Sequence, residues 1–343
     1  MTMKPYVTII LLFTSLLTLA QGEANVWYFG RNAGLDFNSG TPIALNNGQL
    51  NTLEGSATIA DANGQLLFYT DGITVWNRNH NVMLNGTGLF GNPSSTQSGV
   101  IVPKPNDPDV YYIFTVDAEG NPGGLRYSEV NMSLNGGNGG VTSLKNVPLN
   151  TPNSEKISAV RHCNGNDYWV VSHDLENNFR TYAVTDLGVD ANPVVSTVGS
   201  IHVNPHGYLK ISPNGKKVAV AKAIVNPAFP SFLDILDFDT ATGMLSNPIT
   251  ISIFDDFYGG AYGVEFSPNS EILYVNDFSL LTDEPARVYQ LDLTLSNATD
   301  IINSNTVLYE GQDDISAIQL GPDRKIYLAN YNTEFLDVIE NPN

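Results

Sequence analysis

The chain has 343 residues, of which 42% are apolar and 15% charged, with a formal net charge of −19. This length allows one large domain or two ordinary ones, and the apolar content is enough for a buried core. The negative charge repels phosphate backbones and anionic membrane surfaces, so nucleic acid and lipid headgroups are excluded as expected partners.

The first twenty residues have the pattern of a secretory signal peptide. Lys4 provides a positive n-region, residues 7–19 are apolar, and residues 18–20 (TLA) form a small-residue cleavage site. The apolar stretch is shorter than the roughly 20 residues that a membrane span requires. We therefore expect residues 1–20 to be removed and residues 21–343 to form one domain without membrane insertion. An uncleaved anchor is the alternative.

The rest of the chain repeats one phrase, in which an apolar alternation, a tight turn and a second apolar run follow one another. FSPNSEILYVND at 266–277 and ISPNGKKVAVAKA at 211–223 are two examples. The turns lie 44 to 58 residues apart and centre near Asn63, Asp107, Gly165, Asn214, Asn269 and Asp323. This period, with several strands per unit and no convincing helical pattern, is typical of the blades of a β-propeller.

Each unit divides into short strands. The predicted strands of the fifth unit are 263–266, 272–276, 287–293 and 305–309, those of the N-terminus are 26–29, 34–37 and 42–45, and those of the sixth unit are 315–320, 325–329 and 335–339. The sequence thus predicts an all-β propeller of about seven four-stranded blades, made of six readable repeats and a partial N-terminal blade. Six blades, with the N-terminus pairing onto the sixth repeat, are the alternative. Because missing strands leave an open edge, ring closure is expected to be incomplete. We expect either that the natural polypeptide continues beyond Asn343 or that the chain is a truncated gene product.

Two resemblances follow from these motifs. SPNGK at 212–216 resembles the SPDGK turn of WD-repeat-like propellers. NVWYFGRNAGLDFNSGTPIAL, LLFYTDGITVWNRNHNVM, GTGLFGNPSSTQSGVIVPKP and HGYLKISPNGKKVAV resemble the N-terminal propeller region of large secreted proteins of gliding Bacteroidetes. The resemblance implies a secreted or cell-surface protein, followed in that family by PKD modules and a type IX secretion sorting domain. This chain departs from the pattern by lacking both, which leaves surface attachment open.

Polar side chains are expected to gather on one face of the ring. Asp71, Asp117, Asp174 and Asp277 each follow the second strand of a unit and would form a loose acidic ring there. His173, His202 and His206 are expected to converge near a groove between two blades, with Tyr208 close by. The candidate binding residues are His173, His202, His206, Asp174, Asp277 and Tyr208. The alternative is that the aspartates cap turns and the histidines are ordinary loop residues.

No further signature of catalysis or of a cofactor is present. HExxH, GxSxG, CxxC and nucleotide-binding glycine patterns are absent from the sequence. No catalytic or metal residue is predicted, although a divalent cation such as calcium is tolerated by the acidic composition. The fragment from Asp61 to Gly64 lacks the additional carboxylates of a calcium loop.

The single cysteine excludes an intramolecular disulfide, and Cys163 is expected to be structural. Trp27, Trp76 and Trp169 are expected to pack between blades, with stacking on sugar rings as the alternative.

The sequence therefore favours a secreted or cell-surface, non-enzymatic binding or adhesion module whose loops recognise a protein or a glycan. One alternative is a secreted hydrolase or lyase acting on polysaccharide through His173, His202 and His206. Another is a spacer without a ligand inside a larger adhesin. The sequence gives no expectation of oligomeric state.

Overall fold

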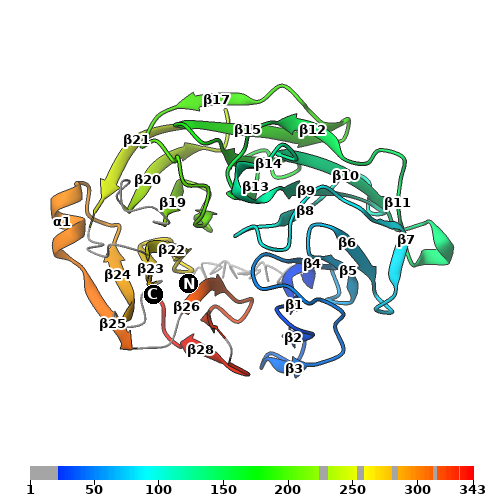
Figure 1. Cartoon of the computed structure of the whole chain (residues 1–343), viewed down its shortest axis with the longest axis horizontal. Coiled ribbons are helices and arrows are strands. Elements are labelled where there is room, and N and C mark those ends of the chain that lie inside the picture. The colour runs from blue at the N-terminus through cyan, green and yellow to red at the C-terminus, as the bar shows by residue number, and fades with distance from the viewer. Residues whose placement is uncertain (1–21, 224–230, 253–258, 280–284, 312–314, 332) are drawn as a thin grey trace, which may run out of the picture.

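The computed structural model describes residues 22–223, 231–252, 259–279, 285–311, 315–331 and 333–343. Short antiparallel sheets stand around a common axis in chain order, like the blades of a propeller (Figure 1). The predicted signal peptide lies outside the described residues. No helix in the described part of the chain has the length and apolar character needed to cross a membrane.

The N-terminal half forms the first three groups of strands. They are β1 (Val26–Phe29), β2 (Ala33–Asp36) and β3 (Ile43–Leu45); β4 (Ala57–Ala60), β5 (Leu66–Thr70), β6 (Thr74–Asn77) and β7 (Val82–Thr87); and β8 (Gly99–Pro103), β9 (Val110–Val116), β10 (Leu125–Asn131), β11 (Gly140–Val141) and β12 (Val147–Asn150). A parallel bridge between Gly140 of β11 and Leu84 of β7 joins the second and third groups into one sheet.

The C-terminal half continues the same arrangement. Its strands are β13 (Ile157–Arg161), β14 (Tyr168–His173), β15 (Asn178–Thr185), β16 (Gly188–Val189) and β17 (Val194–Thr197); β18 (Leu209–Ile211), β19 (Lys217–Lys222), β20 (Phe232–Asp239) and β21 (Met244–Ile251); β22 (Gly259–Phe266), β23 (Ile272–Ser279), β24 (Ala286–Asp292) and β25 (Thr306–Gly311); and β26 (Ile315–Leu320), β27 (Ile326–Asn330) and β28 (Leu336–Ile339). The helical segments are short: η1 (Gly22–Ala24), η2 (Ala118–Gly120), η3 (Asn135–Gly137) and α1 (Ala298–Asn303).

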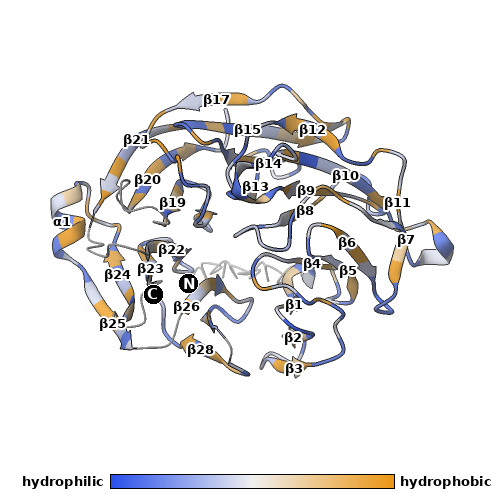
Figure 2. Ribbon diagram, viewed as in Figure 1, coloured by the Kyte–Doolittle hydropathy of each residue, from blue (hydrophilic) through white to orange (hydrophobic). Residues whose placement is uncertain are grey.

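The middle strands are buried along almost their whole length because each sheet packs between two neighbours. All seven residues of β9 are buried, and β14 and β19 are buried except at their first residues. Strands covered on both faces read as continuous apolar runs instead of alternating ones. Figure 2 shows the apolar residues on the strands and mostly hydrophilic residues on the connections between them.

The repeated turn has a physical explanation in one side chain and one backbone conformation. The hydroxyl oxygen of Ser212 accepts hydrogen bonds from the backbone N–H groups of Lys216 and Lys217, and Gly215 has φ +70°. In FSPNSE, Ser267 accepts from Ile272 N–H in the same way, while Ser270 adopts φ +66° without being glycine. The serine before proline therefore ties the turn to the start of the next strand.

The two ends of the chain meet through aromatic side chains. The rings of Trp27 in β1 and Tyr327 in β27 lie 5.6 Å apart in an edge-on arrangement, and Phe37 lies 5.5 Å from Tyr327. Among the described residues, no backbone ladder joins β1–β3 to β26–β28, so side chains make this junction. The propeller fold and the strand positions of the N-terminal partial blade and of the fifth and sixth units are confirmed, whereas the number of blades stays a prediction.

Candidate functional site

The connections between successive sheets meet around one end of the axis. We call residues 51–56, 92–98, 151–156 and 198–208 the mouth loops. Their backbones are linked in sequence: Gly55 N–H donates to Ser95 O at 3.1 Å, Gln97 N–H to Glu155 O at 3.2 Å, and Glu155 N–H to Pro205 O at 3.2 Å. These hydrogen bonds hold loops from four parts of the chain side by side.

A cavity of about 520 Å³ extends along the axis beside the mouth loops, and its walls include residues of β1, β4, β8, β13, β18, β22 and β26. Aromatic and polar side chains share this lining, among them Trp27, Glu54, Gln97, Tyr208, Lys210 and Tyr262. The size lies within the range of about 300 to 1,000 Å³ typical of small-molecule sites. The cavity can therefore take a compact ligand with both flat and hydrogen-bonding faces.

Glu155 is the buried centre of the mouth. One carboxylate oxygen accepts from the N–H and the hydroxyl of Thr96, both at 2.8 Å, and the other accepts from the N–H of Glu119 at 2.9 Å. The Glu155 side chain has no exposed surface. Three hydrogen bonds thus fix its orientation and compensate part of the cost of burying a carboxylate.

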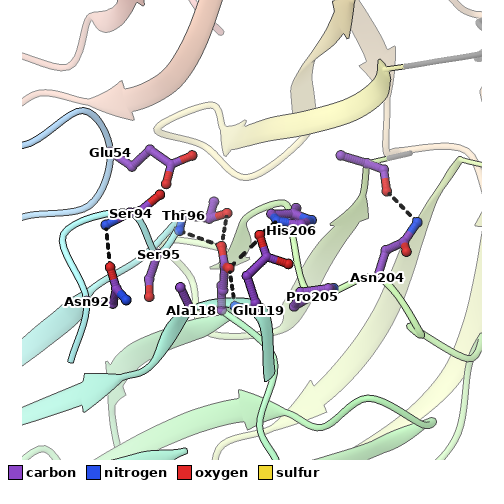
Figure 3. Close-up of polar contacts among 12 residues, drawn as sticks. Glu54, Asn92, Ser94, Ser95, Thr96, Ala118, Glu119, Asn204, Pro205 and His206 are labelled. Atoms are coloured by element: carbon purple, nitrogen blue, oxygen red, sulfur yellow. Dashed lines mark hydrogen bonds and ion pairs between the residues drawn. The ribbon is translucent and has the colours of Figure 1, made fainter. Parts of the chain in front are cut away.

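His206 faces this carboxylate from the next mouth loop. Its Nε2 atom lies 3.1 Å from Oε1 of Glu119 and 3.8 Å from Oε1 of Glu155. Figure 3 shows Glu119 and His206 pointing toward one another, with Glu54 and Thr96 nearby. Glu119 is brought here by η2, in which it adopts φ +56°. An imidazole between two carboxylates has the chemical groups for proton transfer or for binding a metal ion.

A third carboxylate, that of Glu54, borders the cavity. Its Oε1 atom accepts a hydrogen bond from the Tyr262 hydroxyl at 3.1 Å. Burial, and after it the negative charge of Glu155, raise the pKa of Glu54. Burial also raises the pKa values of Tyr208 and Tyr262, so both phenols stay protonated at neutral pH and keep a proton to donate.

Lys156 supports the His206 loop from inside. Its fully buried ammonium donates to the backbone oxygens of Pro205 and His206, both at 2.6 Å. Burial lowers the pKa of Lys156 to about 7. The side chain is occupied by these two carbonyls, which gives it a positioning role.

The structure brings two of the three predicted histidines together, but in the interior. The rings of His173 and His202 lie 4.3 Å apart, and neither side chain is exposed. Their predicted place on a ligand-facing surface is therefore wrong, because both are buried, His173 against Phe179 and His202 against Phe232. His206 alone of the three lies at the mouth, while Tyr208 lines the cavity.

The predicted acidic ring is mostly a set of local caps. Asp71 accepts from the N–H groups at positions 73 and 74, Asp117 accepts from those at 118 and 123, and Asp174 accepts from those at 176 and 178. Asp277 is buried, and its carboxylate lies 3.4 Å from the hydroxyl of Tyr289. For Asp71, Asp117 and Asp174, the alternative prediction of turn capping is confirmed.

The remaining sequence predictions also have definite positions. Asp61 caps its own turn through the N–H groups of Asn63 and Gln65. Cys163 is exposed, so the prediction of a structural cysteine is wrong. Trp27 packs against Tyr327 of another sheet, and the Trp169 indole donates to Thr240 O across sheets, as inter-blade packing requires. Trp76 stacks on a tyrosine of its own sheet.

Sequence reasoning missed the side chains that surround His206: Glu54, Thr96, Glu119, Glu155 and Lys156. A signal for one pair was present, since NSEKIS places adjacent opposite charges directly before an apolar strand. Because Glu155 and Lys156 come directly before an inner strand, their side chains have to be buried or face the axis. Their grouping depends on contacts between distant segments, such as the 87 residues between Glu119 and His206 and the 111 between Thr96 and Gly207, which no local pattern contains.

Neither a protein-family model nor a curated protein sequence matches this chain. Among solved structures, hydrazine synthase of Kuenenia stuttgartiensis is similar with a TM-score of 0.51 and 13% identity, over 98% of this chain and 99% of that one. A proposed 6-phosphogluconolactonase of Bacteroides fragilis gives a TM-score of 0.49 and 14% identity over 83% and 81% of the two chains. At such identities the likeness concerns the fold alone: the chain is a propeller-like all-β protein.

Proposed function

We propose that this protein is a secreted or cell-surface binding module that takes a glycan end into its axial cavity. The observation that carries the proposal is the lining of that cavity, where the rings of Trp27, Tyr208 and Tyr262 stand beside Glu54, Gln97 and Lys210. Sugar rings present flat apolar faces and hydroxyl edges, and these match aromatic faces beside a few placed polar groups.

The secreted location rests on the predicted signal peptide and on the sequence resemblance to propeller regions of large secreted Bacteroidetes proteins. The net charge of −19 agrees with a neutral or cationic ligand and disfavours polyanionic ones. The alternative is that the mouth loops bind a protein instead of a glycan, and the experiment below distinguishes the two.

A second candidate function is a hydrolase or lyase acting on polysaccharide. The observation that favours it is the group of Glu119, Glu155 and His206, which could donate and accept protons at the cavity mouth. His173 and His202, buried as a pair, have no part in this version.

The test uses a panel of neutral and acidic oligosaccharides, with binding measured by glycan array and titration calorimetry. Leu53 lines the cavity and is 62% exposed, so Leu53→Trp should obstruct the cavity without disturbing the core. Leu187→Trp is the matched control, because Leu187 is 96% exposed on the hairpin that joins β15 to β16. We expect Leu53→Trp to weaken glycan binding at least tenfold and Leu187→Trp to leave it unchanged.

Equal binding by both variants would place the ligand elsewhere and overturn the proposal, as would binding of proteins but of no glycan. Chromatography of the incubated oligosaccharides separates the two functions. Recovery of intact glycan supports the binding module, whereas shortened or unsaturated products that disappear in Glu119→Gln would establish the enzyme.

A further inference from the structure

The group at the mouth has the composition of a metal site. The donor atoms of Glu119, Glu155 and His206, two carboxylate oxygens and one imidazole nitrogen, all lie within 4.8 Å of one another. They come from three different segments of the chain: η2, the loop before β13 and the loop before β18. Their convergence is therefore a property of the fold and not of one acidic stretch.

The spacing of the donors fits a small divalent ion. Ligand atoms about 2.0 to 2.1 Å from a tetrahedral Zn²⁺ are separated from one another by about 3.3 Å. Nε2 of His206 lies 3.1 Å from Glu119 Oε1 and 3.8 Å from Glu155 Oε1. Shifts of a few tenths of an ångström would bring both oxygens to that separation.

Groups behind the donors hold them in place. Thr96 binds the second oxygen of Glu155 through its N–H and its hydroxyl, which turns Oε1 toward His206. Lys156 binds the carbonyls of Pro205 and His206 and so fixes the backbone that carries the imidazole. Such outer contacts orient the ligands of protein metal sites.

The charge balance points to a cation independently of the spacing. Glu155 is fully buried, and in the described part of the chain its only basic partner within 4 Å is the His206 imidazole. Glu54 adds another carboxylate close enough to interact with both Glu155 and His206. Buried carboxylates are normally paired with cations or coordinate metals. The buried ammonium of Lys156 interacts with Glu155 through space, but its hydrogen bonds go to the carbonyls of Pro205 and His206, so the Glu155 oxygen that faces His206 has no direct bond to a lysine.

We propose that Glu119, Glu155 and His206 form a three-ligand site for a divalent transition-metal ion, with Zn²⁺ as the ion that fits best. An imidazole ligand favours Zn²⁺ over Ca²⁺ and Mg²⁺, which take oxygen ligands. Three protein ligands leave the fourth position of a tetrahedral ion for water or a bound ligand. Thr96, which holds Glu155, also lines the cavity, so the site lies next to it. This inference does not depend on the cavity binding a glycan.

The experiment is zinc titration by calorimetry on the chain after chelator treatment, with CaCl₂ titrated in parallel. One Zn²⁺ per chain is expected, with Ca²⁺ binding far more weakly. Glu119→Gln and His206→Gln are each expected to weaken Zn²⁺ binding by about tenfold or more, the range seen even for supporting residues. Glu119 is 64% exposed, so its variant should fold normally, which the unfolding temperature in chelator verifies.

Cys163 provides the necessary control, because its exposed thiol lies 3.6 Å from Nδ1 of His162 and could bind zinc by itself. Cys163→Ser should keep the zinc affinity. The Co²⁺ complex should show visible bands of a nitrogen and oxygen site without thiolate charge transfer. Absence of zinc binding, loss of it in Cys163→Ser, or unchanged affinity in folded Glu119→Gln and His206→Gln would each overturn the proposal.

Discussion

The imidazoles of His173 and His202 pack against one another inside the protein, tilted by 52° with ring centroids 4.3 Å apart, and Nε2 of His202 lies 4.0 Å from Oδ2 of Asp234. Burial, together with the positive charge of Lys156, lowers the pKa of His173 to about 3 and that of His202 well below its ordinary value. The positive charge of Lys222 lowers the pKa of His202 further. The hydrogen bond and the negative charge of Asp174 raise the pKa of His173 and so oppose part of its decrease. The pair is therefore neutral in the folded protein at neutral pH.

The buried histidine pair predicts that the free energy of unfolding decreases as the pH falls. The unfolded chain binds protons at these histidines near pH 6.5, while the folded chain does not, so stability is complete above pH 6.5 and falls as the pH drops toward 3. The expected loss between pH 6.5 and 4.5 is about 2 kcal/mol from His173, and His202 adds a loss of the same sign. Urea unfolding at several pH values measures it. His202→Phe should flatten the dependence and His162→Gln should not; equal slopes in all three proteins would refute the explanation.

Removing the Glu155 carboxylate is expected to lower the free energy of unfolding much more than removing the neighbouring carboxylate of Glu119. Glu155→Ala leaves the N–H and hydroxyl of Thr96 and the N–H of Glu119 without their acceptor, so we expect a loss of about 3 kcal/mol. Glu119→Ala removes an exposed side chain and should change the free energy of unfolding by less than about 0.5 kcal/mol. Urea denaturation in chelator compares the two, and similar losses would show that the burial of Glu155 is not important.

Phe37 tests the junction between the two ends of the chain. Its buried ring packs against Trp27 and Tyr327, so Phe37→Ala should cost about 3 to 5 kcal/mol. Hydrogen exchange in β1–β2 and β26–β28 should accelerate more than exchange in β14. Phe335→Ala is the matched control, since Phe335 is 62% exposed in the last unit and its truncation should be nearly neutral. Uniform acceleration across all sheets would contradict a local junction.

Two turn positions with positive φ predict stability changes of opposite sign on substitution. Gly215 has φ +70°, so Gly215→Ala should lower stability by about 1 kcal/mol. Arg324 adopts φ +68° in the equivalent turn of the last unit and is exposed. Arg324→Gly should therefore raise stability by about 0.5 kcal/mol, the relief of strain exceeding the added entropy of the unfolded chain. Thermal unfolding measures both, and a destabilised Arg324→Gly would show that its side chain makes contacts that matter.

The fold could be read from the sequence because its determinants are local and repeated. A tight turn between two apolar runs recurs in every unit, with serine and proline at 212–213 and 267–268, and strands such as β1 and β26 lie where the pattern predicts. The site could not be read in this way. His206 meets Glu119 across 87 residues, and only the packing of successive sheets brings them together. The predicted surface position of His173 and His202 was wrong because the sequence pattern indicates where a strand ends, but not whether a loop then covers the side chain.

The chain of backbone hydrogen bonds among the mouth loops has a consequence for recognition. Each loop is fixed by its neighbour, from Gly55 and Ser95 through Gln97, Glu155 and Pro205. A rim built in this way is preorganised, so an incoming ligand need not spend interaction energy on ordering the protein. The same linkage restricts change, because altering the conformation of one loop disturbs the hydrogen bonds of the next. New specificities are therefore expected to arise from side-chain replacements on an unchanged rim and not from loops of new length.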